Sequence, residues 1–441
     1  MARNTDDLVR MDVGYLVQEL ENNAHDLNMS MDKLMEEIGD ARFVLLGEAS
    51  HGTHEYYIWR ARISQKLIKE KNFSFIAVEG DWPDCYKINR FIKGYEDAGE
   101  KASDVLKEFK RWPTWMWSNW EIAALTEWLR MYNNDLPSEK KIGFYGLDVY
   151  SLWESLESIA KYMKFNDPEA YETTLKAMNC FESMGLGNEK DIAFSSLTPR
   201  SCREKVVKLL NEIQSKMITY NTDLEAPFNA EQNALVTLNA EKYYNAMISG
   251  GISSWNIRDS HMMETLNRLM KFHGKDAKCI VWEHNTHIGD ARETDMASSG
   301  LYNLGQLARE QHKKEDVKLI GFGSYRGSLI AADQWEGKMK KKEAPPARIN
   351  SWEEILHQVT PADKYFLSKE INQLTGLHEY LDHRAIGVVY HPGREKFGNY
   401  VPTLIPRRYD AFIFLDETTP LHPMDIEPAG QLVPQTYPWE L

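Results

Sequence analysis

Acidic and histidine residues follow apolar, strand-like runs at four places in this chain, and residues of these types can exchange protons with a bound substrate. In chain order they are Glu48, His51, Glu79, Asp148, Glu283, His284 and His287. The apolar runs that precede them span residues 43–46, 75–78, 142–147 and 279–282. Ligands of open α/β sheets bind at the carboxyl ends of the strands. The pattern therefore predicts a single polar site assembled from distant parts of the sequence.

The segment from Gly47 to Gly52 predicts the point where the first strand gives way to a helix, with Ser50 as its N-cap. A helix N-terminus disfavours imidazolium, so His51 is expected to stay neutral there and to accept a proton from water. Glu48 could orient this ring or bind a substrate hydroxyl, and Glu79 could supply a second carboxylate. This set resembles a hydrolytic acid–base site. The alternative is a helix-capping histidine with surface acids.

The sequence His284-Asn285-Thr286-His287 follows another apolar run and has the spacing of a metal ligand pair. A divalent cation such as zinc or manganese is therefore possible, held by His51, His284, His287 and Glu79. The H-E-x-x-H signature and a cysteine-rich set are absent, and no cofactor is expected to be required. Glu283 is expected to point to the face opposite His284.

A serine nucleophile is not indicated, because no strand is followed by G-x-S-x-G. Fingerprints of phosphate-binding loops and dinucleotide-binding folds are also missing. Arg326, after the run 317–322, is a candidate for contacting substrate oxygen atoms. Arg60 and Arg258 could clamp a carboxylate or polarise a carbonyl, or could form ordinary helix salt bridges. A site shared by Arg60 and His51 requires His51 to precede the regular helix.

The order of elements predicts an α/β protein with a mainly parallel central sheet flanked by helices. Leading helices are expected over residues 5–38, and strands over 43–46, 75–78, 142–147, 279–282, 317–322, 385–389 and 412–415. Strand signals disappear between residues 151 and 275, where helical segments are expected over 156–163, 171–184, 202–217 and 229–247. We therefore expect an α/β domain over 1–150 and 276–441, with 151–275 as a helical insertion or lid. The proline-containing tail from Pro420 is expected to be extended surface chain.

A tryptophan cluster interrupts this pattern, and it comprises Trp112, Trp115, Trp117, Trp120 and Trp128. Two interpretations remain open. The residues can form a packed loop and helix start, or they can form an aromatic wall for an apolar or carbohydrate-like ligand.

The composition is that of an acidic globular protein. The 441 residues include 66 acidic and 52 basic side chains, for a net charge of −14, which makes nucleic acid and anionic membranes improbable partners. The four cysteines show no metal-type spacing and are too few for a disulfide framework. The N-terminus lacks an apolar signal core, and no stretch has the length of a membrane span. A cytoplasmic location is expected, and the oligomeric state is not indicated.

The ordered motifs of this chain resemble those of the erythromycin esterase family over roughly residues 40 to 420. The resemblance rests on Gly47 to Gly52 with Glu55 and Arg60, Val78-Glu79, Gly146-Leu147-Asp148, the stretch Trp255 to Asp259, His284 to His287, Gly387 to Tyr390, Tyr409 to Phe412, and Asp416 to Thr418. Relatives also carry names linked to succinoglycan, an exopolysaccharide.

The resemblance implies hydrolysis of a macrolide lactone, with His51 as the general base for water and no covalent acyl-enzyme. It assigns functional roles to Glu48, Arg60, Glu79 and His284, while His287, Arg258, Asp148 and Arg326 are expected to bind substrate. The leading hypothesis is a hydrolase acting on a small-molecule ester or macrolactone. The alternatives are a metal-dependent hydrolase of another substrate and a non-catalytic small-molecule binding protein.

Overall fold

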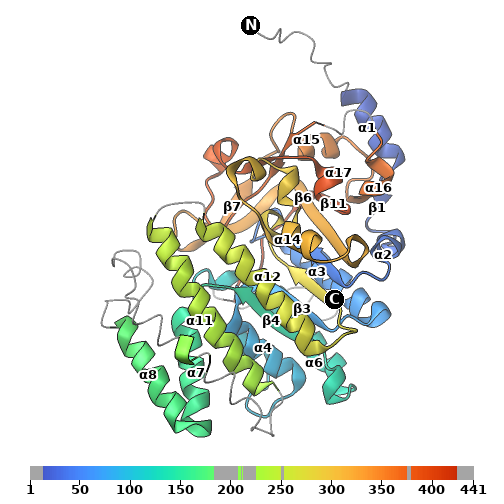
Figure 1. Cartoon of the computed structure of the whole chain (residues 1–441). Coiled ribbons are helices and arrows are strands. Elements are labelled where there is room, and N and C mark those ends of the chain that lie inside the picture. Colours follow the sequence, from blue (N-terminus) through green and yellow to red (C-terminus); the bar gives the residue numbers. More distant parts are fainter. Residues whose placement is uncertain are drawn as a thin grey trace.

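A twisted sheet with helices on both faces forms the centre of the protein in this computed structural model (Figure 1). The structure describes residues 13–182, 207–209, 211, 225–249, 253–374 and 379–424. The strands of the central sheet are β1 (His25–Asp26), β2 (Phe43–Leu46), β3 (Phe75–Asp81), β4 (Gly143–Asp148), β5 (Cys279–Trp282), β6 (Val317–Ala332), β7 (Met339–Ala344), β8 (Lys364–Leu367) and β11 (Ala411–Thr418). Two further strands, β9 (Leu381–Arg384) and β10 (Tyr400–Thr403), pair with each other.

The strand order is β1-β8-β11-β6-β2-β5-β3-β4, with β7 beside β6. Neighbours from β11 to β4 run parallel, whereas β1, β7 and β8 are antiparallel additions. The predicted α/β class with a mainly parallel sheet is confirmed. β2, β3, β5 and β6 lie side by side, so the segments that follow them meet at one edge of the sheet.

Helices cover the sheet and extend beyond its β4 edge. They are α1 (Val13–Asn22), α2 (Asp32–Ile38), α3 (His54–Lys71), α4 (Trp82–Lys93), α5 (Ala102–Leu106), α6 (Trp120–Asn134), α7 (Leu152–Asn166), α8 (Pro168–Glu182), α11 (Ala226–Ser249), α12 (Ser253–His273), α13 (Asn285–Ile288), α14 (Leu304–Gln311), α15 (Trp352–His357), α16 (Ser368–Ile371) and α17 (Ile405–Arg408). The predicted 202–217 helix and the positions Leu8 and Met11 lie mostly or wholly outside the described residues.

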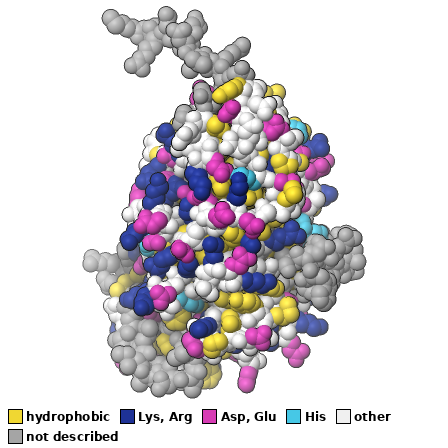
Figure 2. Space-filling view, turned by 90° about the vertical axis from the view of Figure 1, so that its right-hand side faces the viewer, with side chains coloured by type: hydrophobic (Ala, Val, Ile, Leu, Met, Phe, Trp, Pro, Cys, Tyr) yellow, Lys and Arg dark blue, Asp and Glu magenta, His cyan; other side chains and the backbone are white. Residues whose placement is uncertain are grey.

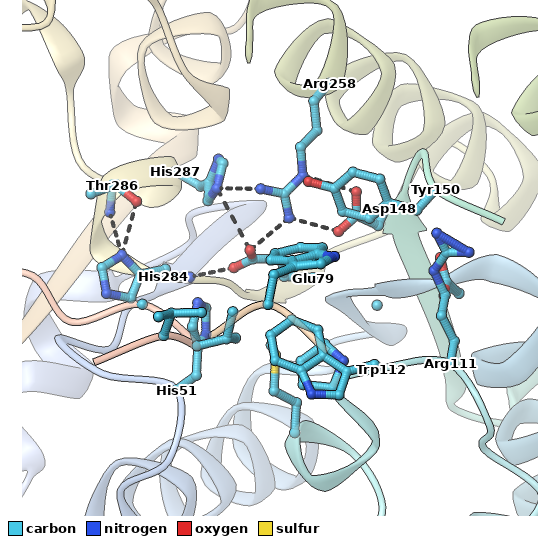
Figure 3. Close-up of a pocket in the computed structure, with 18 of the residues that line it drawn as sticks. His51, Glu79, Arg111, Trp112, Asp148, Tyr150, Arg258, His284, Thr286 and His287 are labelled. Carbon is cyan, nitrogen blue, oxygen red and sulfur yellow. Dashed lines mark hydrogen bonds and ion pairs between the residues drawn. The ribbon is translucent and has the colours of Figure 1, made fainter. Parts of the chain in front are cut away.

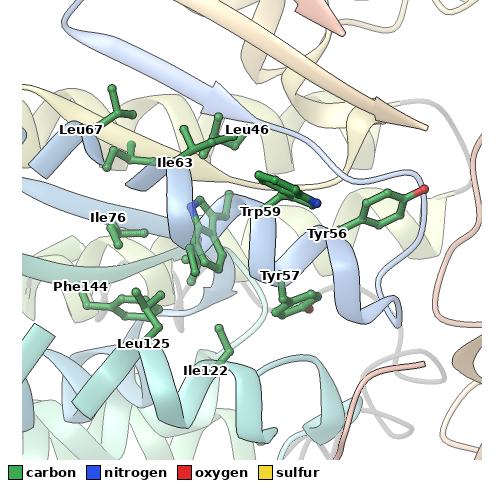
Figure 4. Packing of buried hydrophobic residues seen from close by; sticks show 14 of the residues in the cluster. Leu46, Tyr56, Tyr57, Trp59, Ile63, Leu67, Ile76, Ile122, Leu125 and Phe144 are labelled. Carbon is green, nitrogen blue, oxygen red and sulfur yellow. The ribbon is translucent and has the colours of Figure 1, made fainter. Parts of the chain in front are cut away.

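The alternation of side chains along each strand builds two cores. Val44 and Leu46 of β2 face α3 and α6, while Phe43 and Leu45 face α12 and α14. Figure 4 shows Leu46 near Ile63 in the first of these cores. Both faces of the sheet are buried, which explains why the strands read as continuous apolar runs.

The helical segment after β4 has a core of its own. α7, α8 and α11 pack together around residues such as Leu156 and Ala234, and in Figure 1 they form the green group beside the sheet. α12 differs, because its Met262 and Leu266 belong to the core of the sheet. This helix therefore ties the helical segment to the α/β body.

Three sequence expectations are wrong. Residues 385–389 are not a strand and make only isolated bridges, Ile386 with Ser50 and Val389 with Ala332. The chain just after Pro420 is not surface chain, since Leu421 and Met424 are buried in the core. β6 continues well past residue 322 because it pairs with β7. The lysine-rich sequence of β7 shows no strand pattern.

The surface is mixed in charge. On the face shown in Figure 2, basic and acidic side chains are interspersed. Among the described residues, no helix is both long and apolar enough to cross a membrane.

Candidate active site

A cavity of about 1100 Å³ opens at the carboxyl ends of the strands, between the sheet and the helical segment. Its polar lining includes His51, Glu79, Asp148, Arg258, His284, Thr286 and His287. Five of these seven were expected to meet at the sheet edge on the basis of strand ends, and they do (Figure 3). The apolar lining comes from the loop around residue 112, from α11, and from the segments 385–389 and 398–401.

A buried chain of contacts runs from the cavity into the core through Glu48. Glu48 Oε1 lies 3.0 Å from His51 Nδ1, and Glu48 Oε2 accepts a hydrogen bond of 2.8 Å from Arg60 Nη2. Arg60 is fully buried, with its guanidinium over the rings of Tyr57 and Trp282. It does not line the cavity. Arg60 is therefore connected to His51 through Glu48, and its expected catalytic role stays a prediction.

His51 precedes the regular helix, as a shared site with Arg60 requires. α3 begins at His54, with Thr53 as its N-cap residue, so the expected N-cap Ser50 is wrong. Ser50 Oγ instead pairs with Thr53 Oγ1. The turn that holds His51 is fixed by backbone hydrogen bonds from Ile386 to Ala49 and from Ile330 to Gly52.

The surroundings of His51 shift its pKa in the direction opposite to the one expected from a helix N-terminus. Burial favours the neutral ring, but the carboxylates of Glu79 and Glu48 outweigh burial and raise the pKa of His51. The helix dipole is weak at this distance, because its effect falls off within the first turn. When His51 does lose its proton, the Glu48 contact holds the remaining proton on Nδ1 and leaves Nε2 as the acceptor.

Arg258 is the centre of the second half of the site (Figure 3). Its Nη2 donates to Glu79 Oε1 at 2.7 Å and to Asp148 Oδ2 at 2.6 Å, and its Nε donates to Asp148 Oδ1 at 2.9 Å. Burial alone would raise the pKa of Glu79, but His287, Arg258 and His51 outweigh burial and lower it. The guanidinium also lies over the ring of Tyr150. Glu79 therefore stays ionised beside the buried arginine.

Two neighbours define the tautomer of His287 when its ring is neutral. Nε2 then accepts from Arg258 Nη1 at 2.9 Å, and Nδ1 carries the proton and donates to Asp259 at 3.0 Å. The ring stacks on Trp255 with a centroid separation of 4.5 Å. Asp259 and Trp255 were not predicted as site residues. Their spacing was a usable signal, because residues 255, 258 and 259 share one face of a helix.

His284 is held as a neutral donor. Its Nδ1 lies 2.8 Å from Thr286 Oγ1 and accepts from the Thr286 backbone, which leaves the proton on Nε2. Burial, with His51 beside it, lowers the pKa of His284 well below its usual range. The His51 and His284 rings lie 4.9 Å apart. The backbone N–H of His284 donates to Glu79 Oε2 at 2.8 Å, which ties β5 to β3.

Glu283 faces away from the cavity, as expected. It is fully buried and neither oxygen has a hydrogen-bond partner within the described structure. Burial, with Glu79 and Asp259 nearby, raises the pKa of Glu283 well above its usual range. The surroundings of this carboxyl group therefore favour its protonated form.

The four residues considered for a metal are not equally free to bind one. Both ring nitrogens of His287 are engaged, and Arg258 places a fixed positive charge against Glu79. His51 and His284 keep one ring nitrogen each without a hydrogen bond. Metal dependence at this cavity stays a prediction.

Two further expectations are resolved by position. Arg326 does not reach the cavity; it is half exposed on β6 and pairs with Glu417. The tryptophan cluster fits each of the two interpretations in part. Trp112 and Trp117 line the cavity, as the aromatic-wall interpretation requires, whereas Trp115 is buried in the core.

Comparisons with known proteins place this geometry in context. A sequence model described as erythromycin esterase matches residues 68–418. An erythromycin esterase type II of Escherichia coli is 25% identical over 67% of this chain and 71% of its own length. A putative hydrolase, YbfO, of Bacillus subtilis (strain 168) is 22% identical over 86% of this chain and 84% of its own length.

Solved structures share the fold. A structure titled as a succinoglycan biosynthesis protein has a TM-score of 0.75 at 19% identity, over 93% of this chain and 98% of its own. An erythromycin esterase mutant, EreC in its open conformation, has a TM-score of 0.62 at 16% identity, over 88% of this chain and 93% of its own.

Proposed function

Because the chain belongs to the erythromycin esterase family, we propose that it hydrolyses a carboxylic ester or macrolactone by general-base attack of water. Family membership supports an esterase-like hydrolase. The observation that carries the mechanism is the contact of His51 Nδ1 with Glu48, which leaves Nε2 available to a ligand in the cavity.

In this mechanism His51 Nε2 takes a proton from a water molecule while the water oxygen bonds to the ester carbonyl carbon. The proton later passes from His51 to the departing alkoxide as the carbon–oxygen bond breaks. Glu48 stabilises the imidazolium formed in between, and Arg60 holds Glu48 in place.

The developing negative charge on the carbonyl oxygen needs donors that do not have to rearrange. The Nε2–H of His284 has no hydrogen-bond partner among the described residues, but this nitrogen is buried, so it acts on the charge as a fixed dipole and not as a direct donor. Arg258 supplies a fixed positive charge close by. Donors held in advance inside a cavity stabilise such a charge more than water does.

A covalent acyl-enzyme has little support in the cavity. None of the described lining residues is a serine or cysteine, and Thr286 is the one lining residue with an aliphatic hydroxyl. Its hydroxyl and its backbone N–H both contact His284 Nδ1, so this nitrogen is not a free base. Direct attack by water is therefore favoured.

The apolar part of the cavity indicates the size of the substrate. Trp112, Trp117, Tyr243 and Trp255 lie around a volume at the upper end of the range for small-molecule sites, which is roughly 300–1,000 Å³. A large ester with an apolar body fits this wall.

The test is mass spectrometry of a panel of macrolactones and simpler esters incubated with the full chain in water enriched in ¹⁸O. Wild-type protein should add one water, with a single labelled oxygen in the carboxylate after one turnover. His51→Ala should fold and lose turnover by at least about 10², the lower bound for a general base. Turnover that survives in His51→Ala would reject the base, and an adduct of acyl mass on Thr286 would reject direct water attack.

Two other results would redirect the assignment. Hydrolysis that stops with a chelator and returns with a divalent metal would favour a metal-dependent enzyme. Tight binding of a ligand without product would favour a binding protein.

A further inference from the structure

A second cluster of ligand-type side chains lies outside the cavity. His54 begins α3, Glu121 lies in the first turn of α6, and His422 lies in the segment after β11. Nδ1 of each histidine lies 2.6 Å from the same oxygen, Oε1 of Glu121. None of the three residues lines the cavity. Among the described residues, they are the one group of three or more such side chains whose ligand atoms lie within 4.8 Å of one another.

The carboxylate at the centre is ready to bind a cation. Glu121 is 4% exposed, so this charge is shielded from water. Two ring nitrogens therefore converge on one oxygen, and each must bring a proton to make its contact. A divalent cation bound to all three atoms would replace both protons.

The backbone holds the three residues in place. The N–H of His54 donates to Thr419 at 3.0 Å, and the N–H of Trp120 donates to His422 at 3.0 Å. Isolated bridges join Thr53 to Pro420 and Asn119 to Pro423. The cluster thus lies where the chain after β11 crosses the starts of α3 and α6.

The donor set selects the type of metal. Two imidazole nitrogens and one carboxylate form a ligand set that zinc uses when a fourth position is left for water. The side chain of His422 is 34% exposed, so water can reach the fourth position. Hard cations such as Mg²⁺ and Ca²⁺ prefer oxygen ligands and match this set poorly.

We propose that His54, Glu121 and His422 form a Zn²⁺ site that fastens the segment after β11 to the N-termini of α3 and α6. The site is separate from the proposed hydrolytic site and does not depend on that function. Binding replaces protons by the metal, so it should be accompanied by proton release and weaken at acidic pH.

The experiment uses the full chain, freed of metal by a chelator and then titrated with Zn²⁺ against a chromophoric zinc indicator. We expect one tight site in the wild type and a rise in the melting temperature on adding Zn²⁺. Glu121→Gln and His422→Ala should weaken this site by more than about 100-fold, because loss of a ligand costs more than loss of an outer partner. His357→Ala, which removes another histidine paired with a carboxylate, is the matched control and should bind as the wild type does.

His284→Ala separates this site from the cavity. Tight zinc binding that persists in His284→Ala and disappears in His422→Ala supports the proposal. Absence of tight binding in the wild type would overturn it, as would binding lost in His284→Ala and kept in His422→Ala. Circular dichroism of each variant checks that the fold is intact, and Co²⁺ absorption typical of tetrahedral nitrogen and oxygen ligands gives an independent readout.

Discussion

Replacing Glu48 by Gln exchanges a single oxygen for an NH₂ group, yet it should disable His51. The carboxylate now accepts from two donors, His51 Nδ1 at 3.0 Å and Arg60 Nη2 at 2.8 Å. A glutamine has one acceptor oxygen, so it can satisfy one of these donors. Arg60 is fully buried and can only donate, so the amide oxygen should remain with it and the NH₂ group should face His51.

This arrangement would force the neutral His51 into the other tautomer. Nδ1 would accept from the amide, and the proton would move to Nε2, the nitrogen assigned as the base. Because general-base catalysis contributes about 10²–10⁴ in rate, kcat should fall by that factor while KM changes little. The pKa of His51 should also fall, because one of the carboxylates that raise it is gone.

Two measurements test this reasoning in the same protein. The ¹⁵N shifts of the His51 ring report its tautomer and its pKa without any substrate, with the signal assigned by its loss in His51→Gln. Hydrolysis of an ester turned over by the wild type gives kcat and KM. Glu353→Gln is the matched control, because it also removes a buried carboxylate that accepts from an imidazole, that of His383, but away from the cavity. An unchanged tautomer together with unchanged kcat in Glu48→Gln would refute the assignment of Nε2 as the base.

Three further predictions concern pH and substrate size. The raised pKa of His51 places the acid limb of the pH–rate profile above the usual histidine value of about 6.5, and a limb below 6.5 would contradict this assignment. The same shift stabilises the folded protein at low pH, and this contribution fades as pH rises through the folded-state pKa of His51. The folded protein keeps a proton on Glu283 that the unfolded chain loses above about pH 4.3, so the free energy of unfolding falls as pH rises. In urea unfolding, the stability of Glu283→Gln relative to the wild type should therefore increase between about pH 4 and 7. A constant difference would argue against a buried neutral acid. Trp335 packs against Trp112 on the cavity wall, with the ring centroids 4.6 Å apart. Because such aromatic pairs contribute about 0.5–1.5 kcal/mol, Trp335→Ala should raise KM by up to about tenfold and leave kcat unchanged. A fall in kcat alone would contradict this prediction.

The sheet and the cavity edge were predictable because both depend on local pattern. Strands buried on both faces read as apolar runs, and polar residues at their carboxyl ends must meet when the strands are parallel. Glu79, Asp148 and His284 were found in this way. β7 was missed because its three consecutive lysines, Lys340 to Lys342, leave no apolar run. The segment 385–389 was mistaken for a strand because apolar residues that line a cavity look like residues that line a core.

The roles of the two arginines show where sequence reasoning stops. Arg60 and Arg258 both lie in helices. The family resemblance gave Arg60 the more direct role, although a helix continuous from His51 would have placed Arg60 on the opposite side. In three dimensions Arg258 faces the cavity and pairs with Glu79 and Asp148, while Arg60 lies behind Glu48 in the core. Which arginine meets the substrate depends on the crossing of α3 and α12 over different strands, and that is set by packing far from either residue. The position of Arg60 behind Glu48 is therefore recognised from its lack of contact with the cavity, and not from its distance in sequence from His51.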